Sequence, residues 1–114
     1  MNDNPLSLEQ QAGMLMAEGV TLASTSDASL DGSYALGYLP MLGLQAEVNA
    51  LLLSQGTTFA DGTTSLNWPD KAGAHHAFTP AQFHDFALAV SNFAVQCVLF
   101  AQGGAAPSTT ITIA

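Results

Sequence analysis

The chain has 114 residues, the size of one ordinary globular domain, and hydrophobic residues make up 48% of it. Nine Asp and Glu residues stand against one lysine and no arginine, so the formal net charge is −8. Nucleic-acid phosphates and anionic lipids are held mainly by Lys and Arg, so we expect no nucleic-acid and no membrane partner. Only 9% of the residues are charged, which leaves much of the surface to small and apolar side chains. We therefore expect a protein partner or a homo-oligomer.

The first third of the chain predicts a helix followed by a pair of short strands. Ser7 and Gln10 have the spacing of a capping box, which favours a helix over residues 7–18, and Gly19 is a typical helix stop. Residues 20–25 are rich in β-branched side chains and predict a strand. A turn at 26–32 and a return strand at 33–36 complete this part.

The middle third predicts a helix and a β-hairpin. The helix runs over residues 40–55, with Pro40 in the first turn and Gly56 as its stop. One face of this helix is expected to carry Leu44, Val48, Leu51 and Leu52. Residues 64–68 and 74–78 flank a strong turn signal at 69–73 and predict the hairpin.

The clearest local signal opens a long C-terminal helix over residues 80–102. Thr79 is expected to cap it, Pro80 to occupy its first position, and Gln82 to complete a capping box. A core stripe then recurs at spacings of three and four residues: Phe83, Phe86, Val90, Phe93, Cys97 and Phe100. The same spacing places the single cysteine, Cys97, in the core as a small buried side chain.

A second apolar strip on this helix is more than a domain of this size needs for its own core. It consists of Leu88, Val95 and Leu99. Strand character returns at residues 109–113, which could join the sheet of this chain or that of a partner. We therefore predict an interface made of Leu88, Val95, Leu99, Ile111 and Ile113.

These elements predict an α+β fold in which a small antiparallel sheet of hairpins packs against two or three helices. We expect one domain over residues 1–114. Its parts are an N-terminal helix (1–19), strands and a turn (20–37), a helix–hairpin–helix module (40–103) and a tail strand (104–114). The start of the chain has no signal-peptide pattern, and no apolar stretch reaches the roughly 20 residues that span a bilayer. We therefore expect synthesis in the cytoplasm.

No residues form a recognisable catalytic, metal or cofactor site. His75, His76 and His84 are close in sequence, but adjacent strand residues face opposite sides of a sheet, so His75 and His76 are poorly placed to share a metal. The carboxylates are scattered, and no nucleophile motif or phosphate-binding glycine loop is present. We expect a protein that is not an enzyme and binds no cofactor. Trp68 could stack on a sugar, but its position more often anchors a hairpin onto a helix.

Several segments in a fixed order resemble small proteins encoded among the tail genes of phages and prophages. The segments are residues 10–11, 19–26, 32–36, 58–63, 68–70, 73–79 and 83–90. Over about residues 40–102 the chain is also similar, more loosely, to the DUF4376 module of phage tail-fibre and tail-fibre-assembly proteins. The shared motifs are structural signals, so no catalytic residue is carried over.

The resemblance implies a virion-associated role in the tail. Our first hypothesis is a structural component at the fibre, baseplate or tail tip, acting as an adaptor that contacts other tail proteins in several copies. The alternatives are a tail-fibre assembly chaperone that is absent from the mature virion, and a capsid decoration protein. A small enzyme or a sugar-binding module is a further class.

Overall fold

Three α-helices and five short strands follow one another in the computed structural model, which describes residues 6–114. Their bounds are α1 Leu8–Glu18, β1 Val20–Ser24, β2 Gly32–Tyr34, α2 Tyr38–Leu53, β3 Leu66–Pro69, β4 His75–Phe78, α3 Pro80–Ala101 and β5 Thr110–Ile113, with a 3-10 turn, η1, at Ala28–Leu30. The α+β class is confirmed, including the long C-terminal helix. The first five residues of the predicted segment 1–19 lie outside the described part.

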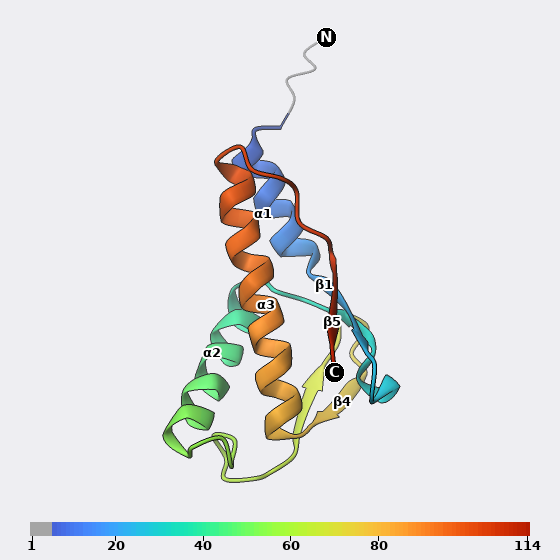
Figure 1. Cartoon of the computed structure of the whole chain (residues 1–114), viewed down its shortest axis with the longest axis vertical. Helices are drawn as coiled ribbons and strands as arrows, with labels where there is room; N and C mark the ends of the chain where they lie inside the picture. Colours follow the sequence, from blue (N-terminus) through green and yellow to red (C-terminus); the bar gives the residue numbers. More distant parts are fainter. Residues whose placement is uncertain (1–5) are drawn as a thin grey trace.

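Helix α3 is the axis around which the other elements are arranged (Figure 1). Helix α1 packs along its C-terminal half and α2 lies beside its N-terminal half, while the strands cover the remaining side. The helix begins as predicted: the Thr79 side chain accepts a hydrogen bond from the Gln82 N–H, and the Gln82 side chain accepts one from the Thr79 N–H. In both bonds a backbone N–H donates, to Thr79 Oγ1 and to Gln82 Oε1, so each satisfies a backbone donor that has no partner within the helix.

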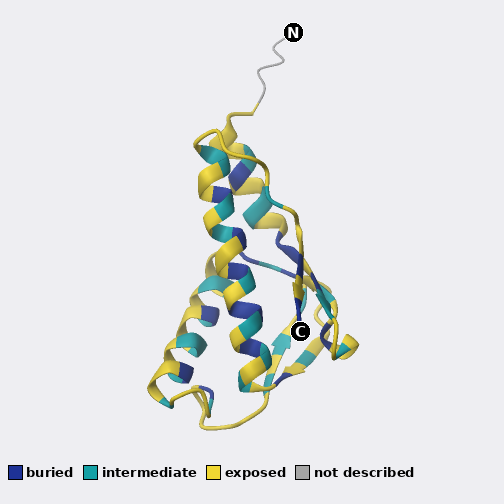
Figure 2. Ribbon diagram, viewed as in Figure 1, coloured by how far each residue is buried: buried dark blue, intermediate teal, exposed yellow. Residues whose placement is uncertain are grey.

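The predicted stripe of α3 forms the centre of the core (Figure 2). Its buried members are Phe83, Phe86, Val90, Phe93 and Cys97, and Phe100 is half-buried. The Phe86 ring packs against Tyr34 and Phe78, with ring centroids 5.0 and 5.2 Å away, and the Phe83 ring packs against Phe78 at 5.7 Å. Such aromatic pairs add stability beyond the area they bury.

Helix α3 also corrects one expectation. At 22 residues it is long and apolar enough, by length and composition, to cross a membrane. Only a third of its most apolar 18-residue stretch is buried. That buried face nevertheless forms the core of this chain, as it does in the central helices of globular proteins.

The main sheet has the order β2-β1-β5 and is mixed, whereas hairpins alone were predicted. Strand β1 pairs antiparallel with β2 and parallel with β5, with Thr21 opposite Thr110 and Ser24 opposite Ile113. Alternate residues of β5 point into the core, so Ile111 and Ile113 are only 8% and 5% exposed. The tail strand therefore joins the sheet of its own chain, and these two residues belong to the core instead of the predicted interface.

The second sheet is the predicted hairpin of β3 and β4, with Trp68 directly opposite His76. The Trp68 ring lies 5.3 Å from that of Phe83 and against Gly43 of α2, where a Cβ would come within 3.2 Å of the indole. Trp68 therefore joins the hairpin to both helices, which supports the structural interpretation of this residue.

Helix α2 differs from the prediction at both its start and its face. It begins at Tyr38, two residues earlier, and Pro40 remains in the first turn. Leu44 and Leu51 are buried as expected, but Leu52 is 72% exposed. The outer side of α2 is therefore apolar and open to solvent.

Candidate functional site

Large apolar side chains are exposed along α2 and α3. Leu88, Val95 and Leu99 of the predicted interface lie on one side of α3 and are each more than half exposed. They recur at intervals of seven and four residues, which aligns them along one face of the helix. From Phe86 to Gln102 the chain carries no charged residue, so this face can approach another protein without desolvating a charge.

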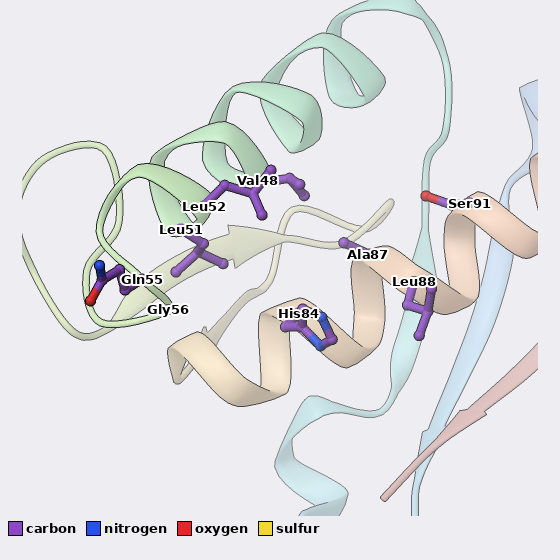
Figure 3. A pocket seen from close by; sticks show the side chains of 9 residues that line it. All are labelled: Val48, Leu51, Leu52, Gln55, Gly56, His84, Ala87, Leu88 and Ser91. Carbon is purple, nitrogen blue, oxygen red and sulfur yellow. The ribbon is translucent and has the colours of Figure 1, made fainter.

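A groove lies between the two helices where this face meets α2, and we call it the α2–α3 groove (Figure 3). It has a volume of about 310 Å³ and is lined by Val48, Leu51, Leu52, Gln55, Gly56, His84, Ala87, Leu88 and Ser91. Leu51 and Ala87 are buried and form its floor, while the exposed Leu52 and Leu88 form its rims. The groove is therefore a mostly apolar channel with one wall from each helix.

The surroundings of the groove carry negative charge. Asp85 follows the lining residue His84 on α3 and lies beside the rim residue Leu88, with which it lines a neighbouring hollow. The carboxylate of Glu47 on α2 instead accepts a 2.8 Å hydrogen bond from the Ala60 N–H, outside the groove.

The single lysine, Lys71, is in the hairpin turn, where its Nζ donates a 2.8 Å hydrogen bond to the Glu18 carbonyl at the end of α1. A cation is favourable at that helix end. Lys71 is not among the residues that line the groove.

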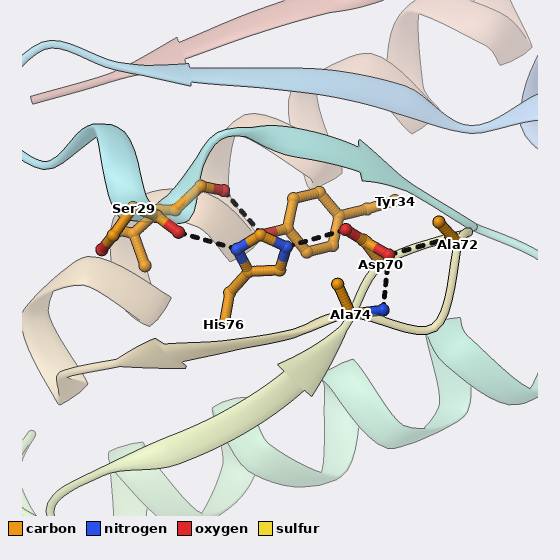
Figure 4. Close-up of polar contacts among 7 residues, drawn as sticks. Ser29, Tyr34, Asp70, Ala72, Ala74 and His76 are labelled. Atoms are coloured by element: carbon orange, nitrogen blue, oxygen red, sulfur yellow. Dashed lines mark hydrogen bonds and ion pairs between the residues drawn. The ribbon is translucent and has the colours of Figure 1, made fainter.

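A second cluster of polar groups lies under the hairpin, centred on His76 (Figure 4). Nε2 of His76 is 2.8 Å from Oδ2 of Asp70, and Nδ1 is 2.7 Å from the Ser29 carbonyl oxygen. The other carboxylate oxygen, Oδ1 of Asp70, accepts hydrogen bonds from the N–H groups of Ala72 and Ala74 at 2.9 and 3.0 Å. The cluster links the hairpin turn to η1.

This geometry shifts both titratable groups toward their charged forms. The hydrogen bond to Asp70, followed by that to the Ser29 carbonyl, raises the pKa of His76 above 6.5. The hydrogen bond from His76 is the main cause that lowers the pKa of Asp70 below 3.8. Both acceptors lack protons to give, so the ring makes both bonds only as an imidazolium.

Tyr34 forms the inner wall of this cluster. Its ring centroid lies 5.4 Å from that of His76, and its hydroxyl donates a 2.6 Å hydrogen bond to the Leu30 carbonyl. Burial is the main cause that raises the pKa of Tyr34, and the charges of Asp70 and Asp31 add to it. The phenol is therefore a neutral donor that is already engaged.

The His76 cluster has no group free for catalysis. A general base needs an unoccupied nitrogen within reach of a substrate, and both ring nitrogens of His76 are engaged. His75 points to the opposite side of β4 and is exposed. His84 lies on α3 with its Nδ1 3.3 Å from Asp85. Within residues 6–114, no three His, Cys, Asp or Glu side chains are grouped closely enough to hold a metal ion.

The pairing of His76 with Asp70 was not predicted from the sequence. The hairpin pattern could have indicated it: His76 lies directly opposite Trp68, so the two side chains share the inward face of the hairpin. The contact with Ser29 could not be foreseen, since it joins residues 47 positions apart through the packing of two separate sheets.

Comparison with known proteins adds no relative: no family model, curated protein or solved structure matches the chain.

Proposed function

We propose that this chain is a non-enzymatic structural protein of a phage tail, an adaptor at the fibre, baseplate or tail tip that works by contacts with other tail proteins and with its own copies. The assignment to the phage tail rests on the sequence resemblance. The assignment of a function in protein–protein contact rests on one observation, the uncharged apolar face of α3 formed by Leu88, Val95 and Leu99.

The energetics of that face favour a partner. Burying apolar surface stabilises an association by about 25 cal/mol for each Å² removed from water. The three side chains are more than half exposed and lie on a capped helix whose opposite face is fixed in the core. A rigid apolar face of this kind loses little conformational entropy on binding.

Mass spectrometry of purified phage particles tests whether the chain is part of the virion. We expect mass spectrometry of particles from the phage or prophage that encodes the chain to detect it at a fixed stoichiometry to the other tail proteins. Detection in infected cells but absence from the particles would instead support the assembly chaperone. Fixed stoichiometry to the major capsid protein in tailless heads would support capsid decoration.

The contact face is tested separately by native mass spectrometry of the purified protein. We expect the wild type to form oligomers and Val95→Asp to shift them toward monomer. Leu53→Asp is the matched control, since Leu53 is 89% exposed on α2 and lies outside that face. A monomeric wild type, or equal loss in both variants, would contradict self-association through α3.

A further inference from the structure

The α2–α3 groove has the form of a site for a third helix. Val48, Leu51 and Leu52 of α2 follow the spacing of successive helical turns on one wall, and Gln55 extends that wall just beyond the helix. His84, Ala87, Leu88 and Ser91 of α3 follow the same spacing on the other wall. Two rows of side chains with a shallow floor between them can receive the ridge of another helix. An amphipathic helix lying in an apolar groove is a common mode of recognition between proteins.

Charge decides between the possible occupants. A second copy of this chain would bring another net charge of −8 toward the Leu88 rim, which Asp85 flanks. Neither helix of the groove carries a lysine or an arginine to balance that carboxylate. A partner with Lys or Arg beside its apolar face would meet a complementary potential, which speeds association and selects the partner.

We propose that the α2–α3 groove binds an amphipathic helix of another protein, with its apolar face on Leu51, Leu52 and Leu88 and its Lys or Arg residues beside Asp85. This assignment rests on the proposed role as a protein-binding adaptor and names the chemistry of the partner. It separates two surfaces. The uncharged end of α3 around Val95 and Leu99 accepts copies of the chain, and the groove, which shares Leu88 with that face and has Asp85 beside it, accepts a basic helix.

The test uses the full chain and synthetic helical peptides of about 18 residues, or five turns. The probe carries Leu on one face and Lys elsewhere. A second peptide keeps the Leu face with Glu in place of Lys, and a third has the composition of the probe in an order that destroys the Leu face. Fluorescence anisotropy of labelled peptides gives the affinities.

We expect the wild type to bind the Leu/Lys helix with an affinity that falls as salt is added. The affinity for each of the other two peptides should be at least about tenfold lower. Leu52→Ser and Leu88→Ser should each weaken binding of the probe by about tenfold. Leu53→Ser is the matched control: it removes the same side chain one residue along α2, outside the groove, and should leave the affinity within about twofold.

Several outcomes would overturn the proposal. Equal binding of the third peptide, or equal weakening by Leu53→Ser, would mean general attraction to an acidic surface without use of the groove. Absence of binding by the probe would remove the basic helix as occupant. Dissociation of a homo-oligomer by Leu52→Ser would identify the occupant as a second copy. These results are independent of whether the chain is found in purified particles. The proposed groove partner and the proposed role in the tail can therefore each be refuted without the other.

Discussion

Nε2 of His76 lies 2.8 Å from Oδ2 of Asp70, and this contact, together with that to Ser29, ties the β3–β4 hairpin to the rest of the domain. The chain has one lysine and no arginine, so a protonated histidine is one of few cations available to it. It is used to join two small sheets that share no strand. A contact of this kind makes the stability of the fold depend on pH.

Stability should be greatest in mildly acidic solution as far as this pair is concerned. The pKa of His76 is raised above 6.5, so its contribution is complete below pH 6.5 and is lost as the pH rises through the higher pKa of the folded state. The pKa of Asp70 is lowered below 3.8, so its contribution is complete above pH 3.8 and is lost as the pH falls through the lower folded value. Together they predict a maximum between pH 3.8 and 6.5.

Thermal unfolding from about pH 5 to about pH 8 measures this effect. We expect the melting temperature of the wild type to fall across the upper part of that range, and His76→Asn to reduce the fall. His75→Asn is the matched control, because the neighbouring ring is exposed and should leave the slope unchanged. Equal slopes in both variants would show that overall charge repulsion, not the His76 contact, sets the pH dependence.

Local signals predicted most of the helices, but not the contacts between distant segments. Thr79, Pro80 and Gln82 mark the start of α3 because capping is a short-range interaction. The strand character of β5 was also visible, but not its parallel pairing with β1, which joins Thr21 to Thr110. Non-local pairing depends on the whole packing arrangement, and the placement of Ile111 and Ile113 at an interface was wrong for this reason.

The candidate site was predicted only in part. Leu88, Val95 and Leu99 were identified because a helix that is apolar on two sides has a surplus face. The wall that α2 contributes to the groove was not predicted, since Leu52 was assigned to the buried side of that helix and is in fact exposed. The helical angle between Leu51 and Leu52 is large enough that one can be buried while the other is exposed, and the sequence does not say where the face ends.

Phe93→Ala tests the core stripe of α3. Phe93 is 2% exposed, so removal of its ring should leave a cavity and lower the free energy of unfolding by about 3–5 kcal/mol. Leu88→Ala, five residues earlier on the exposed side, should cost less than about 1 kcal/mol. Chemical denaturation of both variants gives the comparison. A loss below about 1 kcal/mol for Phe93→Ala would refute its place in the core.

Gly43 tests the contact between α2 and the single tryptophan. Alanine in place of glycine inside a helix should stabilise it by about 1 kcal/mol, and Gly13→Ala should do so, because a Cβ there has no neighbour within 4 Å. A Cβ on Gly43 lies 3.2 Å from Trp68, so Gly43→Ala should gain less and shift the tryptophan emission. Equal gains and an unchanged emission spectrum would mean that the indole is not packed against α2.

Gly19 joins α1 to β1 in a conformation that other residues rarely adopt. Its φ is 84° and its ψ −157°, a region that is essentially restricted to glycine. A Cβ at this position would lie 2.0 Å from the Tyr34 carbonyl oxygen, which belongs to the backbone and cannot move aside without disturbing β2. We expect Gly19→Ala to cost about 3 kcal/mol or more.

Gly103 provides the matched control for that cost. Its φ of 101° is also positive, but no heavy atom lies within 4 Å of the position its Cβ would take. Gly103→Ala should therefore show the backbone strain alone, about 1–2 kcal/mol. The difference between the two variants in denaturant unfolding isolates the clash with β2. If both lost the same stability, the close approach of Gly19 to Tyr34 would not be a feature of the folded chain.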